Sequence, residues 1–599
     1  MFLRKKIING SSIVQLVASY RNREGQPRQR VIASLGDAKL PEQEMRQMAM
    51  AVEMRLQGQL DLIGPELSEE AAEWVARMVR VAQRSKSVAP KDEQPHLDGV
   101  LVDQVQSEQV VPYGAPMVAL HAWEQLGLSD VLRKEGLAPC AIATAQLMVA
   151  NRLIEPLSEW ALIDWAERTA LPEMLDVRIT KTTKDRLYRT SDQILKCRKS
   201  IEQVLRKRER QIFSLNRSVV LYDVTNSHFE GLCALNPKAR HGKNKQRRND
   251  CRQVAVGMAF DGDGFALGHE VFAGNVSDGR TFMEVLDRLI IGEEEGQPVV
   301  VLDAGFASEK ILALLEERNL PYLINVTRSN RQAYAHLFAE GGFEAIAGRG
   351  EDDGVEVKCV PDPDHKHRYL VLCRSQPRRE KEVAMLSRAE ERFQEDANAL
   401  RKRIAAGRLK KPELIQRAIG RLQKKHPRVA RFYSLTHQNG RLELVRHDEK
   451  MEQVLDGCGD YVLKTVWPLD GPTLWRLYMT LLRAENGFQM LKGSVGLRPN
   501  YHQLDRRVDG HIFISVLAYH LLRWIGYTLE QAGDRRDWKT IRRLLGPHSL
   551  VTTRLPLKNG RVVYVRKPSL PDAGQEQVYR KLGIDWRTAF PPVRTEVNP

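Results

Sequence analysis

The sequence predicts an α/β protein in which a mixed sheet with helices on its faces is interrupted by an insertion and preceded by a mostly helical region. Three observations predict this architecture. The apolar periodicity of residues 41–213 is largely helical. From residue 214, short apolar runs alternate with helical segments in the order β-β-β-α-β-α-β. Between residues 331 and 470 this alternation gives way to strand fragments around a long, charged helical pair.

The N-terminal segment predicts a small hairpin. Residues 12–36, SIVQLVASYRNREGQPRQRVIASLG, contain two β-rich runs around REGQP, which supplies turn-forming Gly and Pro. Within the helical region that follows, the polar stretch VAPKDEQPHLDG predicts a linker at residues 88–99.

Apolar runs of strand length define the predicted sheet. They are SVVLYDVT, the two runs around DGDG in CRQVAVGMAFDGDGFALGHEVFAGN, PVVVLDAGF and PYLINVT. The segments SDGRTFMEVLDRLI and SEKILALLEERN predict the intervening helices. After the insertion, helices return from residue 471 to about residue 532, and LKNGRVVYV predicts a C-terminal hairpin.

The charge balance indicates a polyanionic partner. The chain has 599 residues and a formal net charge of +16, and nucleic acid is the commonest partner of a large basic protein. A generic basic surface is the alternative. Membrane-surface binding is disfavoured, because no segment forms a concentrated basic amphipathic helix.

Cysteine usage and terminal composition predict a cytoplasmic protein with no membrane partner. The seven cysteines are scattered and form no C-x-x-C pair, which argues against a disulfide framework and a zinc ribbon. MFLRKKIING has no apolar run after its charges, so it does not predict a signal peptide. ISVLAYHLLRWIGYTL is short and is interrupted by Arg523, which favours a buried helix over a membrane span.

Two strands of the predicted sheet end on an aspartate. Asp223 follows the apolar run Val219–Tyr222, and Asp303 follows Val299–Leu302. If the strands are neighbours, the two carboxylates lie side by side and repel unless a cation neutralises both. Oxygen ligands of this kind suit Mg²⁺ or Mn²⁺. The alternative is that each aspartate only caps the loop or helix that follows.

A late helix, predicted from Leu474 to Lys492, offers a third carboxylate. Tyr478, Glu485 and Lys492 are spaced by seven residues, nearly two helical turns, so they share one face. A glutamate there is in a position to reach the same cation. The alternative is an exposed glutamate on an ordinary amphipathic helix whose leucines, such as Leu477, form the core stripe.

These features together resemble the DDE transposases of bacterial insertion sequences, in the insertion-sequence-four superfamily and its YREK-signature group. The helix motif of that group is Y-x-x-R-x-x-x-E-x-x-x-x-x-x-K, which Tyr478, Glu485 and Lys492 match in register. Leu481 stands where the family usually has Arg, and Arg483 is a candidate substitute. The resemblance extends to YDVTNSHFEG, GHEVFAGNVSDGRTF, VVLDAGFAS, RPNYH and ASYRNREGQPRQRVIASLG, and so runs over most of the chain.

The resemblance implies a ribonuclease H-like core in which Asp223, Asp303 and Glu485 form the catalytic, metal-binding triad. The implied cofactor is Mg²⁺ or Mn²⁺, with two ions bound. The implied activity is strand cleavage at the ends of an insertion sequence, followed by transfer of the 3′-hydroxyl into target DNA. The implied partner is double-stranded DNA, both the terminal inverted repeats and the target, held by a dimer.

Several polar residues are expected to contact DNA. Tyr478 and Lys492 are expected to touch phosphates near the cleaved end. The other candidates are Arg483, Arg498, Tyr501 and His502 around the motif helix, and Lys243, Lys245, Arg247 and Arg248 in HGKNKQRRND. An exposed loop with no DNA contact explains the HGKNKQRRND charges equally well, and a histidine such as His502 is more often structural than catalytic.

Two other functions compete with transposition. A ribonuclease H-like nuclease would cut DNA without joining it, and a catalytically silent, transposase-derived protein would only bind DNA. The expected domains are an N-terminal hairpin, a helical DNA-binding region, the first part of the core, the insertion, the second part of the core with the Glu485 helix, and a tail. Their expected bounds are 1–40, 41–213, 214–330, 331–470, 471–535 and 536–599.

Overall fold

The computed structural model forms two compact units. The first contains Met1–Gln106, Arg554–Tyr564 and Thr595–Pro599, and the second contains Ser107–Thr553 and Val565–Arg594. The structure describes residues 2–8, 11–21, 27–34, 42–56, 67–68, 71–79, 99–177, 183–215, 219–242, 248, 250–289, 298–327, 330–346, 354–438 and 440–597.

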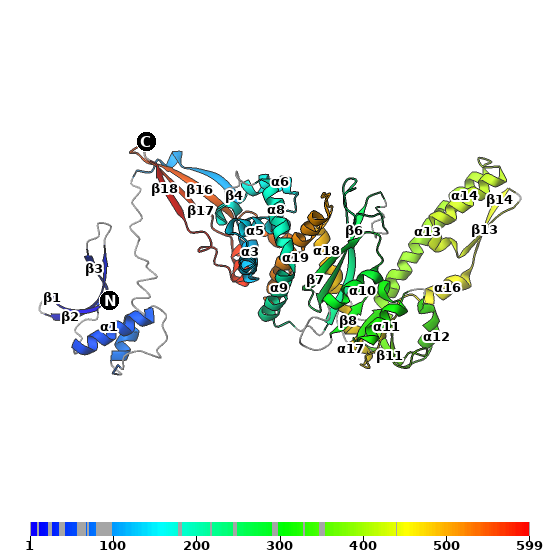
Figure 1. Ribbon diagram of the computed structural model, residues 1–599, viewed down its shortest axis with the longest axis horizontal. Helices are drawn as coiled ribbons and strands as arrows, with labels where there is room; N and C mark the ends of the chain where they lie inside the picture. The colour runs from blue at the N-terminus through cyan, green and yellow to red at the C-terminus, as the bar shows by residue number, and fades with distance from the viewer. Residues whose placement is uncertain are drawn as a thin grey trace. The chain divides into compact units, whose positions relative to one another are not determined.

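The first unit has a small core of its own. Strands β1 (Phe2–Ile8), β2 (Ser11–Arg21) and β3 (Pro27–Ser34) form an antiparallel sheet, so the expected hairpin, β2–β3, gains a third strand (Figure 1). Helix α1 (Glu42–Leu56) and the helical residues 71–79 cover it. The core that they share consists of Val14, Leu16, Met45, Met48, Ala51, Val52, Ala71, Val75 and Met78.

The second unit opens with a layer of helices that packs around one long helix. The layer comprises α3 (Gly114–Gln125), α4 (Leu128–Lys134), α5 (Pro139–Ile154), α6 (Glu159–Glu167), α7 (Leu171–Met174), α8 (Lys184–Lys196) and α9 (Arg198–Phe213). The long helix, α19 (Asp505–Gln531), packs against α5, α8 and α3. Among the described residues, α19 alone is long and apolar enough to cross a membrane, and 78% of its apolar window is buried, as in the core helix expected here.

The central sheet has the strand order of a ribonuclease H-like fold. Its five central strands are β5 (Val219–His228), β6 (Gln253–Asp261), β7 (Ala266–Ala273), β8 (Val299–Leu302) and β9 (Tyr322–Asn325). They lie in the order β7-β6-β5-β8-β9. The first three are antiparallel to one another, whereas β8 is parallel to β5 and β9 is parallel to β8. The predicted α/β, ribonuclease H-like class is therefore confirmed.

Both faces of this sheet are covered, which explains why its strands are apolar without alternation. Val219 and Leu221 belong to the core that includes the helical layer. Val220 and Tyr222, on the opposite face, pack with residues of α10 (Asp278–Leu289) and α11 (Glu309–Glu317). The short 3₁₀ helix η4 (Ala304–Phe306) follows β8.

The region expected as an insertion, 331–470, contains two different structures. Strands β10 (Glu344–Ala345), β11 (Val355–Pro361), β12 (Tyr369–Ser375) and β15 (Asp460–Thr465) extend the central sheet to nine strands, with β15 pairing with β9. The 3₁₀ helix η5 (Asn330–Tyr334) and α12 (Ala335–Phe338) precede them. Periodicity alone cannot reveal such pairing, because the partner strands are far apart in the sequence.

The remainder of that region, residues 376–456, forms a helical body with a separate core. It contains α13 (Gln376–Ala405), α14 (Pro412–Lys425), α15 (Pro427–Ala430), β13 (Tyr433–Gln438), β14 (Arg441–Arg446) and α16 (Asp448–Asp456). Helix α13 runs beside the β13–β14 hairpin (Figure 1). Leu386, Phe393, Ala397, Leu400 and Ile404, on the predicted face of α13, lie in this core.

The C-terminal part completes the fold. Helices α17 (Gly471–Met479) and α18 (Leu481–Gly493) precede α19, and α20 (Trp538–Leu545) and α21 (Ala573–Leu582) follow it. A four-stranded sheet has the order β18-β17-β16-β4 and comprises β4 (Gln106–Pro112), β16 (Ser549–Pro556), β17 (Val562–Pro568) and β18 (Val593–Val597). The turn between β16 and β17 contains the Asn-Gly pair of LKNGRVVYV.

Candidate active site

The two aspartates that the sequence placed at strand ends occupy corresponding positions on neighbouring strands. Asp303 directly follows β8, but β5 continues past Asp223 to His228, so the prediction that this strand ends on Asp223 is wrong. In the parallel pair β5–β8, Tyr222 lies beside Leu302, and Asp223 and Asp303 are the next residues on the two chains. Paired strands lie about 4.8 Å apart. The two carboxylates therefore leave the sheet close to each other, as the repeated pattern of an apolar run followed by Asp predicts.

Each aspartate also makes a local hydrogen bond. Oδ1 of Asp223 accepts the Val224 N–H at 2.7 Å, and Oδ1 of Asp303 accepts the Ala304 N–H at 2.7 Å. Asp303 is thereby the N-cap of η4, the structural role that a single aspartate after a strand suggests. This cap engages only Oδ1, so it is compatible with a second role for the same carboxylate.

The helix predicted from Leu474 to Lys492 is instead two helices, and the single-helix prediction is wrong. Thr480 separates α17 from α18. Its N–H donates to the Leu477 carbonyl at 3.1 Å, and its hydroxyl donates to the same oxygen at 2.6 Å. A threonine hydroxyl that bonds a carbonyl of the preceding turn in this way competes with the helical hydrogen bonds. Tyr478 is therefore on α17, whereas Glu485 and Lys492 are on α18.

Helix α18 presents Glu485 on its exposed side and packs against β5, the strand that carries Asp223. Its other side buries Ala484, Phe488 and Leu491 in the core that also contains Leu221. Gly487 permits this approach: a Cβ there would lie 2.7 Å from the Tyr519 hydroxyl and 3.1 Å from the Phe260 ring. The packing thus fixes the helix that carries the third acidic residue against the strand that carries the first.

Tyr478 lies beside the second aspartate. Its hydroxyl accepts a hydrogen bond from Nδ2 of Asn325 at 3.0 Å, and burial together with the neighbouring Asp303 carboxylate raises the pKa of Tyr478. A tyrosine is protonated at neutral pH even at its ordinary pKa of about 10, so the phenol can donate its proton in a hydrogen bond. Asn325 was not among the predicted site residues, although it is the polar residue that ends β9, the strand next to β8.

Comparison with known proteins identifies the family. The model of the transposase DDE domain matches residues 214–521, just over half of the chain. The chain belongs to the DDE transposase family. The model of the IS1634 family transposase N-terminal domain matches residues 3–61, which supports the predicted origin in a bacterial insertion sequence. Membership of the YREK-signature group stays a prediction.

Structural comparison adds a distant likeness. The cryo-EM structure of a piggyBac transposase synaptic complex with hairpin DNA is 12% identical, with a TM-score of 0.35. The likeness covers 73% of this chain and 82% of that chain. No curated protein matches the chain.

In this transposase, Leu481 and Arg483 have different surroundings. Leu481, at the position where the family motif has Arg, is buried in the core. Arg483 donates to the Gly262 carbonyl at 2.5 Å and to Oδ1 of Asp263 at 2.9 Å, both in the turn between β6 and β7. Lys492, in the last turn of α18, lies 5.6 Å from the centre of the Phe488 ring.

The RPNYH segment of the transposase lies along the end of β5. The Asn500 N–H donates to the His228 carbonyl at 2.9 Å, and the Glu230 N–H donates to the Asn500 carbonyl at 3.0 Å. Tyr501 is exposed over 59% of its surface. Burial, with Arg248 and Arg498 nearby, lowers the pKa of His228.

Two of the predicted DNA-binding arginines lie near His228. Arg248 and Arg498 both lie near the end of the strand that carries Asp223. Arg248 is also 2.9 Å from Asp250. The other basic candidates of HGKNKQRRND, Lys243, Lys245 and Arg247, lie outside the described residues.

His502 is held inside the transposase by a buried charged cluster. Its Nε2 lies 3.2 Å from Oε1 of Glu159, and the Arg152 guanidinium lies 2.9 Å from Nδ1 of His511. Burial opposes ionisation of Glu159, but His502, Arg152 and His511 together lower its pKa to about 2. The potential ligand atoms of Glu159, His502 and His511 lie within 4.8 Å of one another. Arg152 already supplies a positive charge beside Glu159 and contacts His511. A metal ion bound by Glu159, His502 and His511 is therefore disfavoured.

Proposed function

We propose that this transposase cleaves DNA at the ends of its insertion sequence and transfers the resulting 3′-hydroxyl into target DNA, with Asp223, Asp303 and Glu485 as its catalytic residues. The observation that carries the proposal is the pairing of β5 with β8, which gives Asp223 and Asp303 corresponding positions on neighbouring strands. Helix α18, with the exposed Glu485, packs on the same strand β5. The family match supplies the reaction class, phosphoryl transfer on DNA.

The donor set of this site fits a hard divalent cation. All three side chains offer carboxylate oxygens, the ligands that Mg²⁺ and Mn²⁺ prefer. We propose that Asp223, Asp303 and Glu485 hold one or two such ions. When bound, these ions would activate the attacking hydroxyl and stabilise charge on the phosphate oxygens.

The surrounding residues have positioning roles in this proposal. The Tyr478 hydroxyl, which is protonated at neutral pH, donates to a phosphate oxygen near the cleaved bond. Lys492, at the end of α18, supplies a positive charge to the same strand of DNA. Arg498 and Arg248, near the end of β5, extend this basic surface along the duplex. The partners are the terminal inverted repeats and the target DNA, bound by a dimer in the cytoplasm.

The reaction products distinguish this proposal from its two alternatives. The experiment incubates the full-length protein with labelled DNA of the insertion-sequence end, a supercoiled plasmid target and Mn²⁺. Joined products are expected. Cleavage without joining would instead indicate a nuclease, and a mobility shift without cleavage would indicate a catalytically silent DNA-binding protein.

A further inference from the structure

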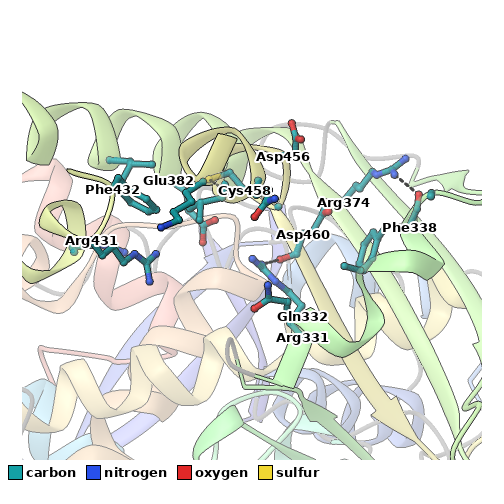
Figure 2. Close-up of a pocket in the computed structure, with 18 residues that line it drawn as sticks. Arg331, Gln332, Phe338, Arg374, Glu382, Arg431, Phe432, Asp456, Cys458 and Asp460 are labelled. Carbon is teal, nitrogen blue, oxygen red and sulfur yellow. Dashed lines mark hydrogen bonds between the residues drawn. The ribbon is translucent and has the colours of Figure 1, made fainter. Parts of the chain in front are cut away.

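A pocket of about 1020 Å³ lies where the helical body 376–456 meets the extended part of the sheet. Residues of η5, α12 and β12 line its sheet side, and residues of α13, α15 and α16 line the other side. Figure 2 shows Arg331 and Gln332 of η5 lining the same pocket as Arg431 and Phe432 of the helical body. The pocket therefore depends on both structures.

Five of the lining side chains are basic, and two of these are engaged within the protein. Arg331 donates to the Asp460 carbonyl. Arg374 donates to the Phe338 carbonyl at 2.6 Å (Figure 2). Its guanidinium also lies 4.4 Å from the centre of the Phe343 ring. These two arginines are held in fixed positions on the sheet side.

The other three basic side chains, Arg428, Arg431 and Lys450, are exposed. Among the residues that the structure describes, none forms an ion pair or a side-chain hydrogen bond with any of the three. Arg431 only stacks on the Phe432 ring, at 4.6 Å from its centre. All three cations therefore remain able to bind an anion.

The acidic residues of the pocket do not neutralise these cations. Glu382 accepts hydrogen bonds from Arg378 at 3.3 Å and from the Gly459 N–H at 3.2 Å. Burial raises the pKa of Asp460, although the nearby Arg374 and Arg331 oppose that shift. Asp456 is the one other acid in the lining, and it is exposed. The three available cations outnumber it.

We propose that this pocket binds phosphate groups, and that their source is the backbone of the DNA bound by the transposase. Four arginines and one lysine line the pocket, and this concentration of positive charge favours an anionic ligand. Guanidinium groups bind phosphate through two parallel hydrogen bonds. This inference rests on the proposed function for the identity of the polyanion. The pocket would anchor DNA at a place separate from the three catalytic carboxylates.

The test measures the affinity of the full-length protein for a fluorescein-labelled duplex of about 40 base pairs as a function of salt concentration. The variant is Arg428→Gln/Arg431→Gln/Lys450→Gln. The control is Arg401→Gln/Lys402→Gln/Lys410→Gln, three exposed basic residues near the far end of α13 and its following loop. Both variants lose the same formal charge, and circular dichroism and a thermal melt verify that both are folded.

If the proposal is right, the pocket variant binds about tenfold more weakly than the control at about 0.1 M salt, and its salt slope is shallower by about 0.9 for each phosphate that the protein no longer neutralises. Equal slopes and affinities for the two variants would overturn it. A second arm adds inorganic pyrophosphate at constant ionic strength. If only pyrophosphate binding depends on the three residues, the pocket takes free phosphate and the assignment to DNA is wrong. The test measures DNA binding and not cleavage, so its result can be interpreted even if the protein lacks the proposed catalytic activity.

Discussion

At the level of single residues, the buried cluster of Glu159, His502, His511 and Arg152 fixes the RPNYH segment to the helical layer. His511 lies against the Arg152 guanidinium, and burial, Arg152 and His502 lower its pKa well below 6.5. The histidine is therefore neutral in the folded protein at pH values where the unfolded chain would protonate it. A structural role for His502 could be expected from its residue type, but its partner Glu159 could not, because Glu159 lies on α6, more than three hundred residues earlier.

This arrangement predicts a pH dependence of stability. Because the folded-state pKa of His511 is depressed, its contribution is fully present above pH 6.5 and is lost as the pH falls below that value. One such group changes the unfolding free energy by at most about 1.4 kcal/mol per pH unit. The measurement is urea unfolding of wild type and His511→Gln between about pH 7.5 and pH 5.5. The slope should flatten in His511→Gln but not in His367→Gln, an exposed control; identical slopes in all three proteins would contradict the assignment.

The acidic triad makes the second prediction at this scale. Asp223→Asn, Asp303→Asn and Glu485→Gln keep the shape of each side chain but remove its negative charge, so each should lower strand cleavage by more than about a hundredfold. DNA affinity should change by less than about threefold, as measured by fluorescence anisotropy. Glu391→Gln, at an exposed position on α13, should cleave like wild type. Retained cleavage in any one of the three variants would remove that residue from the triad.

At the level of elements, the packing of α18 on the sheet matters most to the candidate active site, because α18 carries Glu485 and β5 carries Asp223. The sequence predicted the apolar runs before Asp223 and Asp303 as strands, because four-residue apolar runs are strong local signals, but it did not predict that β5 continues past Asp223 to His228. It did not predict the break at Thr480, because a hydroxyl that bonds the Leu477 carbonyl leaves the apolar periodicity unchanged. Nor did it indicate the pairing of β15 with β9, which depends on contacts distant in the sequence.

The substitution Gly487→Ala tests whether α18 must lie this close to Tyr519. In Gly487→Ala the new Cβ would meet the Tyr519 hydroxyl at 2.7 Å, so α18 must shift or Tyr519 must move. We expect a loss of about 1–3 kcal/mol in unfolding free energy and a larger relative loss of cleavage than of DNA binding. Gly493→Ala, on the same helix, has nothing within 4 Å of its Cβ and should be nearly neutral. If chemical denaturation gives the two variants the same unfolding free energy, the close approach of α18 at Gly487 does not contribute to stability.

At the level of the whole molecule, the nine-stranded sheet connects the candidate active site to the helical body. The run of strands from β5 through β8 and β9 to β15 and β12 is continuous in hydrogen bonding. The sequence indicated an insertion because its charged helices differ from the core in composition, and the helical face of α13 was predictable from spacing. The four strands that extend the sheet were not assignable, since short fragments such as EVKCVP fit an isolated hairpin equally well.

The helical body leaves the sheet and returns to it at a single place. β12 and β15 are antiparallel neighbours, and Arg374 pairs with Asp460 at the point where the chain departs and returns. The whole body is therefore topologically the loop of a hairpin, with its own hydrophobic interior. Replacing residues 376–459 by a Gly-rich turn should leave a protein that still folds cooperatively, as calorimetry would show by one sharp transition. Aggregation of the shortened chain would mean that the two parts are not separable. If it folds, the three available cations of the phosphate pocket can be removed together while every residue of the reaction centre stays in place.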